Sequence, residues 1–527
     1  MNTDWTEGYV AELAYPHAYI AELNPLRLQL PFLRAGLAVP EVRTACELGF
    51  GQGLSVNIHA AASPVAWHGN DFNPDQALHA NALATASGAR LGLTDEAFAD
   101  FCVRDDLPDF DFIGLNGVWS WVSDQNRALI VDFIRRKLKL GGVVYVGYNT
   151  QPGWAASIPV RELLLHYAQH VAAPGDGISS RIQAAVAFAE DLLASDPAFA
   201  RANPSMAALV ASMKGQDTHY LAHEFFNSSW RPMSFTDMAA ALQPAKLRYA
   251  CSGHHDIDRL NLSPQQQSLL NGIGDPVFRE SVRDFCVNQQ FRKDYWVKGA
   301  RPLNPLEHVQ AMRALRVVLQ TPRADVASAV VTELGYTALD PAVFGPLLDA
   351  LADHVPQSLG ELEQACTNTP AELPQIVEAL ALLESNGDIS AVQTDAEQAS
   401  ARPHTDRLNI YLLGKALGSG DIAHLASPLT GGAVLLNRIE QLFLCSALET
   451  PCEVSDLAPR VWQVLAPQGK KLVVNGQALG TDADNLAELD RLAQVFVQHK
   501  LPVLQALGVC PGAVLLDSTH PWKTPSD

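Results

Sequence analysis

The sequence lacks the features that mark secreted, membrane-embedded and nucleic-acid-binding proteins. Its first residues, MNTDWTEGYVAEL, contain acids but no basic segment ahead of an apolar core, so we expect no secretory signal. No uninterrupted apolar run is long enough to cross a bilayer, which argues against membrane insertion. Basic residues number 37 against 57 acidic ones, and the formal net charge of -20 disfavours nucleic acid or anionic lipid as a partner.

The chain also lacks a recognisable cysteine motif. Its 8 cysteines are scattered, and none forms a Cys-x-x-Cys pair. We therefore expect reduced, mostly buried thiols and a cytoplasmic location. His219 and His223 lie four residues apart on one face of an expected helix, but no third zinc ligand stands nearby, so no metal site is predicted. This helix, within HYLAHE, either packs structurally or closes over a substrate.

What the first part of the chain does contain is a regular alternation of strand-like and helix-like segments. The apolar segments 42–48, 65–71, 110–116 and 141–149 are separated by helical patterns that begin near residues 54, 74 and 124. Alternation at this spacing is typical of a parallel sheet with helices on both faces. The predicted fold class is α/β, with a doubly wound, mostly parallel, Rossmann-like sheet followed by helical regions.

Changes of pattern divide the 527 residues into four expected regions. Helical patterns replace the alternation after about residue 160, and the basic, proline-flanked KGARPLNPLEH suggests a boundary near residue 300. Segment 358–392 has the helix, helix, turn and strand order of a winged helix. The expected regions are 1–159, 160–300 (mainly helical), 301–400 (helical, winged-helix-like) and 401–527 (α+β).

The segment TACELGFGQGLSV, residues 44–56, places Gly49, Gly51 and Gly53 after Glu47. A glycine-rich turn between a parallel strand and a helix is typical of a nucleotide site, because backbone amides and the helix dipole face the ligand. The dinucleotide fingerprint is not met, since Leu54 stands where its third glycine belongs. The alternative is a tight strand–helix turn without a ligand.

The E/D-x-G-x-G-x-G turn resembles motif I of class I S-adenosylmethionine (SAM) methyltransferases. This resemblance implies that the loop glycines approach the methionine part of SAM, while Glu47 faces its amino group. Asp71, with Phe72 beside it, ends the second expected strand and would bind the ribose hydroxyls. Alternatively, Asp71 caps the following helix.

The adenine is expected to lie against the segment AFADFCVRDDLPDF. We choose Asp100 with Phe101 for this role. Asp105 and Asp106 compete with them, and all of these acids can equally be solvated surface groups.

Two longer segments indicate one particular group of these methyltransferases. FDFIGLNGVWSWV and GGVVYVGYNTQPGW resemble segments of methyltransferases that carry a methyltransferase regulatory domain, a group that includes bacterial protein-lysine methyltransferases of the rickettsial outer-membrane-protein type. The resemblance implies a SAM-binding methyltransferase domain with an aromatic N-terminal arm at 1–159 and a regulatory or substrate region at 160–300. Asn116 stands where the family pattern often has His, and Gly147 where it has Ser, so the acceptor pocket can differ.

A lysine acceptor must be neutral before it can be methylated, which costs roughly 4–5 kcal/mol at pH 7. Aromatic walls would favour the neutral amine by desolvation. The expected catalytic residues are Tyr148, to order the amine lone pair, Asn149, to accept its hydrogen bond, and Asn116. The expected substrate-channel residues are Tyr15, Tyr19, Trp119, Trp121 and Trp154. The alternative for the three tryptophans, and for Tyr148, is that they pack the sheet against the helices.

Three functions remain open at this stage. The leading hypothesis is a SAM-dependent N-methyltransferase of protein lysine, whose substrates include surface or outer-membrane proteins and which can form a homodimer. The second is a methyltransferase of a sugar or another small molecule, in surface polysaccharide or secondary metabolism. The third is a non-catalytic SAM- or partner-binding protein.

Overall fold

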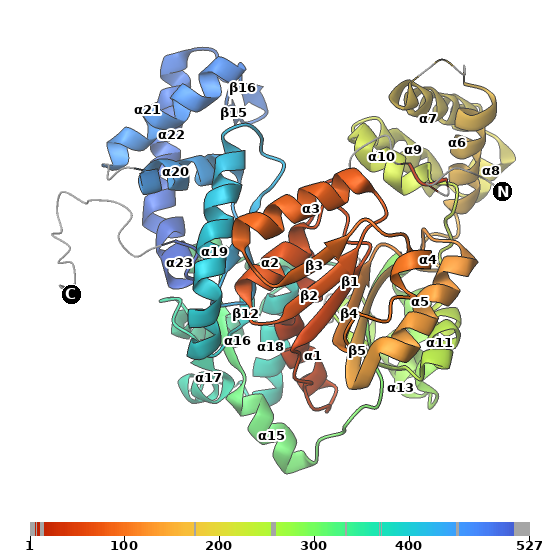
Figure 1. The fold of residues 1–527 in the computed structure, drawn as a ribbon, viewed down its shortest axis with the longest axis horizontal. Helices are drawn as coiled ribbons and strands as arrows, with labels where there is room; N and C mark the ends of the chain where they lie inside the picture. Colours follow the sequence, from red (N-terminus) through yellow and green to blue (C-terminus); the bar gives the residue numbers. More distant parts are fainter. Residues whose placement is uncertain are drawn as a thin grey trace.

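A single mixed sheet lies at the centre of the molecule (Figure 1). The computed structural model describes residues 6, 8–10, 15–172, 175, 177–254, 260–332, 335–367, 369, 371–449 and 453–510. The sheet has 7 strands in the order β3-β2-β1-β4-β5-β7-β6. Its strands are β1 (Thr44–Leu48), β2 (Ala66–Asn70), β3 (Leu91–Thr94), β4 (Phe110–Asn116), β5 (Leu138–Asn149), β6 (Arg248–Ser252) and β7 (Phe291–Val297).

The first five strands run parallel, as the alternating sequence pattern predicts. β7 is antiparallel to both β5 and β6. Because β6 and β7 come from residues 160–300, the sheet extends across the expected boundary at residue 159 into a region expected to be mainly helical. The division of the chain into four domains at these boundaries stays a prediction.

Helices cover both faces of the sheet. Successive side chains of a strand point to opposite faces, so each strand contributes to two cores. On β5, Val143 and Tyr145 join the core that packs against α1, α2 and α3, whereas Val144, Val146 and Tyr148 join the core against α5 and α11. The helices on the first face are α1 (Gln29–Arg34), α2 (Leu54–Ala62) and α3 (Pro74–Ser87). Those on the second face are α4 (Phe98–Phe101), α5 (Asp124–Lys137) and α11 (Phe235–Leu242).

A helical lobe follows β5 and has its own apolar core. It contains α6 (Ile158–His170), α7 (Ile178–Ala194), α8 (Ala198–Ala202), α9 (Ser205–Met213) and α10 (Thr218–Phe225). The lobe lies at the upper right of Figure 1, above the sheet edge that carries α4 and α5. Beyond it, α13 (Pro264–Asn271) and α14 (Pro276–Cys286) separate β6 from β7.

Residues after 300 form a small three-stranded sheet with helices, in the order β11-β8-β12. Its elements are α15 (Pro305–Ala314), β8 (Arg316–Leu319), α16 (Pro341–Ala350), β11 (Gln357–Ser358), α17 (Leu359–Ala365), α18 (Leu373–Asn386) and β12 (Ile389–Ala391). A short hairpin, β9 (Ala329–Thr332) and β10 (Gly335–Ala338), stands beside it. As predicted, α18 ends at Gly387, whose φ of 80° closes the helix in a left-handed turn.

The C-terminal region packs directly against the helix that follows the glycine loop. Leu54 and Ile58 of α2, and Leu83 of α3, share one apolar core with α19 (Asp395–Ala416) and with the hairpin of β13 (His424–Ser427) and β14 (Gly432–Leu435). Every residue of α2 is consequently buried.

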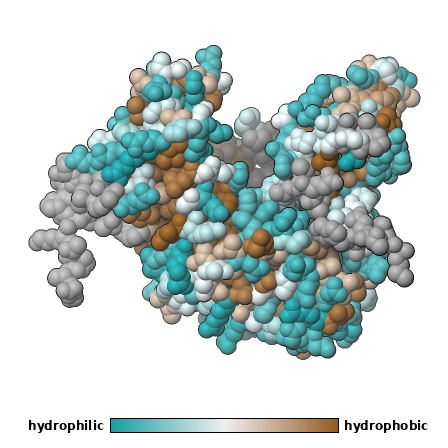
Figure 2. All heavy atoms as spheres, turned by 45° about the horizontal axis from the view of Figure 1, so that its top comes forward, coloured by the Kyte–Doolittle hydropathy of each residue, from teal (hydrophilic) through white to brown (hydrophobic). Residues whose placement is uncertain are grey.

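The last helices complete this C-terminal lobe. They are α20 (Arg438–Glu449), α21 (Val454–Leu465), α22 (Asp482–Val495) and α23 (Leu501–Ala506), with a small hairpin of β15 (Val473–Val474) and β16 (Gln477–Ala478). Figure 2 shows a broad valley in the surface between this lobe and the helical lobe α6–α10. No helix in the described ranges has the length and apolar character needed to span a bilayer.

Candidate functional site

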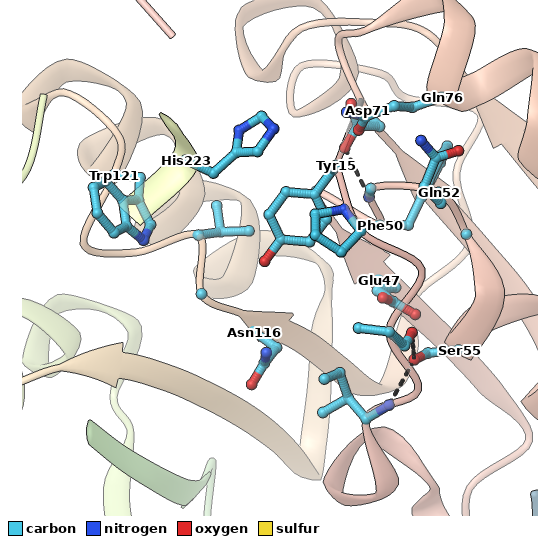
Figure 3. A pocket seen from close by; sticks show the side chains of 18 of the residues that line it. Tyr15, Glu47, Phe50, Gln52, Ser55, Asp71, Gln76, Asn116, Trp121 and His223 are labelled. Carbon is cyan, nitrogen blue, oxygen red and sulfur yellow. Dashed lines mark hydrogen bonds between the residues drawn. The ribbon is translucent and has the colours of Figure 1, made fainter. Parts of the chain in front are cut away.

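A cavity of about 350 Å³ opens where β1, β2 and β4 end at their carboxyl edge (Figure 3). Parallel α/β sheets bind ligands at this edge. The cavity takes residues from the N-terminal arm, the glycine loop, the ends of β2 and β4, and helix α10. Predicted residues in its lining are Tyr15, Glu47, Gly49, Gly51, Gly53, Asp71, Phe72, Asn116 and Trp121.

The glycine loop adopts a backbone that other residues rarely accept. Gly49, Gly51 and Gly53 have φ values of 68°, 58° and 72°. A Cβ atom at Gly49 would lie 2.6 Å from Val118 Cγ2, and one at Gly53 would collide with Ala80 on α3. The three glycines therefore let the loop turn tightly and pack against its neighbours.

Two buried acids face each other across this loop. Glu47 Oε2 is buried and has no hydrogen-bond partner within the described part of the chain. Burial, followed by the nearby charge of Asp71, raises the pKa of Glu47 to about 8. An unpaired buried carboxylate is costly unless a cationic ligand approaches it.

Asp71 is held by backbone amides. Its Oδ2 accepts a hydrogen bond of 2.8 Å from Gly51 N, and its Oδ1 accepts one of 3.0 Å from Asn73 N. Burial nevertheless raises the pKa of Asp71 to about 7. Asn73, rather than Asp71, is the N-cap of α3, so the alternative interpretation of Asp71 as the cap of that helix is not met. A carboxylate has lone pairs for further donors beyond these two amides.

Aromatic rings form a further part of the cavity wall. The ring of Tyr9 lies 5.6 Å from that of Phe72 and 5.4 Å from that of His223. The ring of Tyr15 lies 5.2 Å from His223, and Trp121 stands further along the same wall (Figure 3). The cavity thus joins a polar loop to an aromatic wall.

Helix α10 brings a titratable group to this aromatic side. Glu224 lines the cavity, and its Oε1 accepts a hydrogen bond of 3.5 Å from Asn149 Nδ2 at the end of β5. Burial raises the pKa of Glu224 to about 7, against the lowering effects of Asn149 and Arg161. The Arg161 guanidinium lies over the ring of Trp230, 4.8 Å from its centroid.

The two departures from the family pattern, Asn116 and Gly147, are neighbours in space. They pair in register between β4 and β5, and a Cβ atom at Gly147 would collide with Asn116 Oδ1. That oxygen accepts a hydrogen bond of 2.9 Å from the Tyr145 hydroxyl. Gly147 therefore makes room for the side-chain amide of Asn116. The two departures from the family pattern depend on each other in this arrangement.

Several residues predicted for the acceptor site lie elsewhere. Tyr148 is fully buried on the opposite face of β5, where its hydroxyl donates a 2.9 Å hydrogen bond to Asp294 Oδ2. Trp119 is also in that core, with its Nε1 donating to Met233 Sδ. Asn149 does not line the cavity itself and reaches it only through Glu224.

Two further aromatic predictions fall outside the cavity. Tyr19 packs between His59 and His424, and its hydroxyl accepts a 3.2 Å hydrogen bond from Ala433 N. Trp154 packs against Phe225 in the helical lobe. Trp154 thus packs as its alternative interpretation proposed, whereas Tyr19 contacts the C-terminal lobe through His424.

The predicted adenine residues are also displaced. Asp100 is exposed, and Phe101 is buried in the core beside the ring of Phe133. Ala97 and Phe98, one helical turn earlier, line the cavity space next to Asp71 and Phe72 instead. The cavity therefore meets the predicted segment at Ala97 and Phe98, whereas the role of the segment in holding adenine stays a prediction.

Residues of the helical lobe and the N-terminal arm were missed as lining groups. Tyr220, His223 and Glu224 are spaced three and four apart, so they share one face of α10. The sequence motif HYLAHE carried this signal, and its interpretation as a helix that closes over a substrate agrees with the cavity lining. Tyr9 carried no comparable signal.

This chain is similar to known proteins in both sequence and fold. Residues 217–298 match a family model described as a predicted methyltransferase regulatory domain, which here includes α10, β6 and β7. An uncharacterized protein of Synechocystis is 38% identical over 513 residues, which cover 96% of this chain and 99% of that one. An uncharacterized protein of Rickettsia prowazekii is 29% identical over 289 residues, covering 53% of this chain and 50% of that protein.

Among solved structures, PKMT2 from Rickettsia typhi in complex with AdoHcy superposes with a TM-score of 0.69 at 18% identity. The match covers 94% of this chain and 100% of PKMT2. The chain belongs to one family with the Synechocystis protein, and its residues 217–298 match a methyltransferase regulatory domain. The superposition confirms the expected fold, and the regulatory-domain match agrees with the expected methyltransferase class.

Proposed function

We propose that this methyltransferase transfers methyl groups to lysine side chains of a protein substrate. The observation that carries the proposal is a cavity whose lining combines a glycine loop and two acids with a wall of aromatic rings. Such a wall can take a long aliphatic chain and strip water from its terminal amine. The resemblance to protein-lysine methyltransferases supports the same substrate class.

The residues at the loop end fit the donor. Glu47 presents an unpaired buried oxygen that would hold the amino group of SAM, and the loop would approach its methionine part without side-chain obstruction. Asp71 would accept the ribose hydroxyls, while Phe72 and Phe98 would flank the adenine. When bound, SAM supplies a methyl carbon made electrophilic by its sulfonium.

The residues at the aromatic end would prepare the acceptor. Tyr15, Trp121 and His223 would exclude water from the lysine chain and so favour its neutral form. Asn116, which is oriented by Tyr145, would position the amine by a hydrogen bond. Most of the acceleration then comes from alignment of the two reactants.

The helical lobe would contribute to acceptor recognition in this scheme. Its helix α10 forms part of the cavity wall through Tyr220, His223 and Glu224. We propose that residues 160–300 recognise the substrate segment that carries the lysine.

The test is transfer of tritium from methyl-labelled SAM to cell lysate. We expect label in acid-precipitable protein and, after hydrolysis, in methylated lysine. Gly51→Asp is the inactive control, because a side chain there adds charge beside Asp71 at a φ of 58°. Label in a soluble metabolite would instead favour a small-molecule acceptor. Binding of SAM by calorimetry without any transfer would favour a non-catalytic protein.

A further inference from the structure

We propose that Glu224 accepts the proton that the acceptor ammonium must lose before methyl transfer. This inference rests on the proposed lysine substrate, because only a charged amine needs such a base. It assigns a catalytic role to a residue of the regulatory region, at the face of α10 that meets the end of the central sheet.

The geometry places a carboxylate on the acceptor side of the cavity. Glu224 is hydrogen-bonded to Asn149 at the end of β5, the strand that pairs with β4 and its Asn116, whereas Asp71 accepts from Gly51 of the glycine loop. The opposite face of α10 is anchored, since Leu221 and Phe225 are buried in the core of the helical lobe. The carboxylate is therefore presented from a fixed helix.

The remaining titratable groups in the lining are less suited to the task. Asp71 already accepts two backbone amides, and Glu47 would be engaged by the donor amino group. Burial raises the pKa values of the Tyr9, Tyr15 and Tyr220 phenols above their usual range, so they hold their protons at neutral pH. His223 is the one other candidate base in the described lining, and the experiment below separates it from Glu224.

The surroundings of Glu224 adjust its proton affinity to neutral pH. Asn149 on β5 donates to it and Arg161 on α6 is the nearby cation, and both favour the charged form. Burial opposes them and raises the pKa of Glu224 to about 7, while Tyr220 and Tyr15 are the neighbouring phenols. A general base works best when its pKa lies near the operating pH.

The step balances as follows. The lysine Nε–H bond breaks, the proton moves to a Glu224 oxygen, and the lone pair remains on nitrogen. That pair forms the new N–C bond, while the electrons of the C–S bond of the donor stay on sulfur as a neutral thioether. Glu224 then releases its proton to solvent and is ready for another turnover.

The experiment measures the initial rate of tritium transfer into lysate protein from pH 6 to 9.5 at saturating SAM. We expect the wild-type rate to level off above pH 7. We expect Glu224→Gln to be roughly 10²- to 10⁴-fold slower at pH 7.5. Its rate should then climb steadily towards pH 9.5, because only lysine that is already neutral can react.

Glu162→Gln is the matched control, because this acid is exposed on α6, near Arg161, and does not line the cavity. It should retain the wild-type rate and profile. Glu224→Asp should restore the plateau at reduced rate, and calorimetric affinity for SAM should stay within threefold in every variant. This affinity also verifies that the variants are folded.

Two results overturn the inference while leaving the proposed function intact. One is a Glu224→Gln rate within threefold of wild type at pH 7.5. The other is loss of the plateau in His223→Gln with retention in Glu224→Gln. If the wild-type enzyme labels no lysine at all, the proposed function itself is refuted.

Discussion

Glu47→Gln should stabilise the ligand-free protein and at the same time weaken its affinity for the donor. Glu47 is 5% exposed, and one of its oxygens has no hydrogen-bond partner among the residues that the structure describes. Its pKa is raised from 4.5 to about 8 by burial and then by Asp71. The folded chain therefore holds a proton at pH 7 that the unfolded chain has released.

The sign and size of the effect follow from this shift. Stability from a raised carboxyl pKa is fully present below pH 4.5 and is lost as pH rises towards 8. At 1.36 kcal/mol per pH unit, the loss by pH 7 is on the order of 3 kcal/mol. Glutamine has the same shape and no charge, so Glu47→Gln should be more stable than wild type by up to about this amount at pH 7.5. The difference should shrink towards pH 5.

Donor binding should change in the opposite direction. A hydrogen bond to a charged group contributes about 1.5–3 kcal/mol, so the variant should bind S-adenosylhomocysteine roughly 10- to 150-fold more weakly. Urea denaturation at pH 5 and 7.5 measures the first effect, and calorimetry measures the second. Asp100→Asn is the control, because Asp100 is exposed and outside the cavity. Unchanged stability at both pH values together with unchanged affinity would refute our account of Glu47.

Three further predictions test the local geometry. Gly53→Ala should lower the free energy of unfolding by about 2–5 kcal/mol, because the new Cβ would collide with Ala80. Gly36→Ala is the control, since Gly36 has a similar φ but open space around it, and it should cost only about 1–2 kcal/mol. Equal losses in urea titrations would contradict the close contact at Gly53. Tyr148→Phe should cost about 1–3 kcal/mol through its lost bond to Asp294 but leave methyl transfer intact, so a selective loss of kcat would return Tyr148 to the site. Gly147→Ser should displace the side-chain amide of Asn116 and lower kcat/KM for the acceptor, with little change in donor affinity. An unchanged kcat/KM would show that Asn116 does not position the amine.

The local pattern of the sequence was sufficient to predict the parallel part of the sheet and the glycine loop. Alternation of apolar runs with helical segments reflects the periodicities of backbone structure, which act over a few residues. The turn at residues 49–53 needs φ values near 60–70°, and only glycine adopts them cheaply. Glu47 near the end of β1 and Asp71 after β2 could be placed as well, because parallel strands end at one edge of the sheet.

What only the tertiary structure decided was which side of each element faces the cavity. Tyr148 and Asn149 are adjacent on a strand and must point to opposite faces, so both could never line one pocket. Phe98 and Phe101 pack against the same core, but Phe101 is fully buried beside Phe133, and only Phe98 also reaches the cavity. Glu224 lies 177 positions after Glu47 in the chain and reaches the same cavity only because the helical lobe folds back over the sheet. Local periodicity carries no information about such long-range contacts, because they depend on how whole layers of the protein pack together.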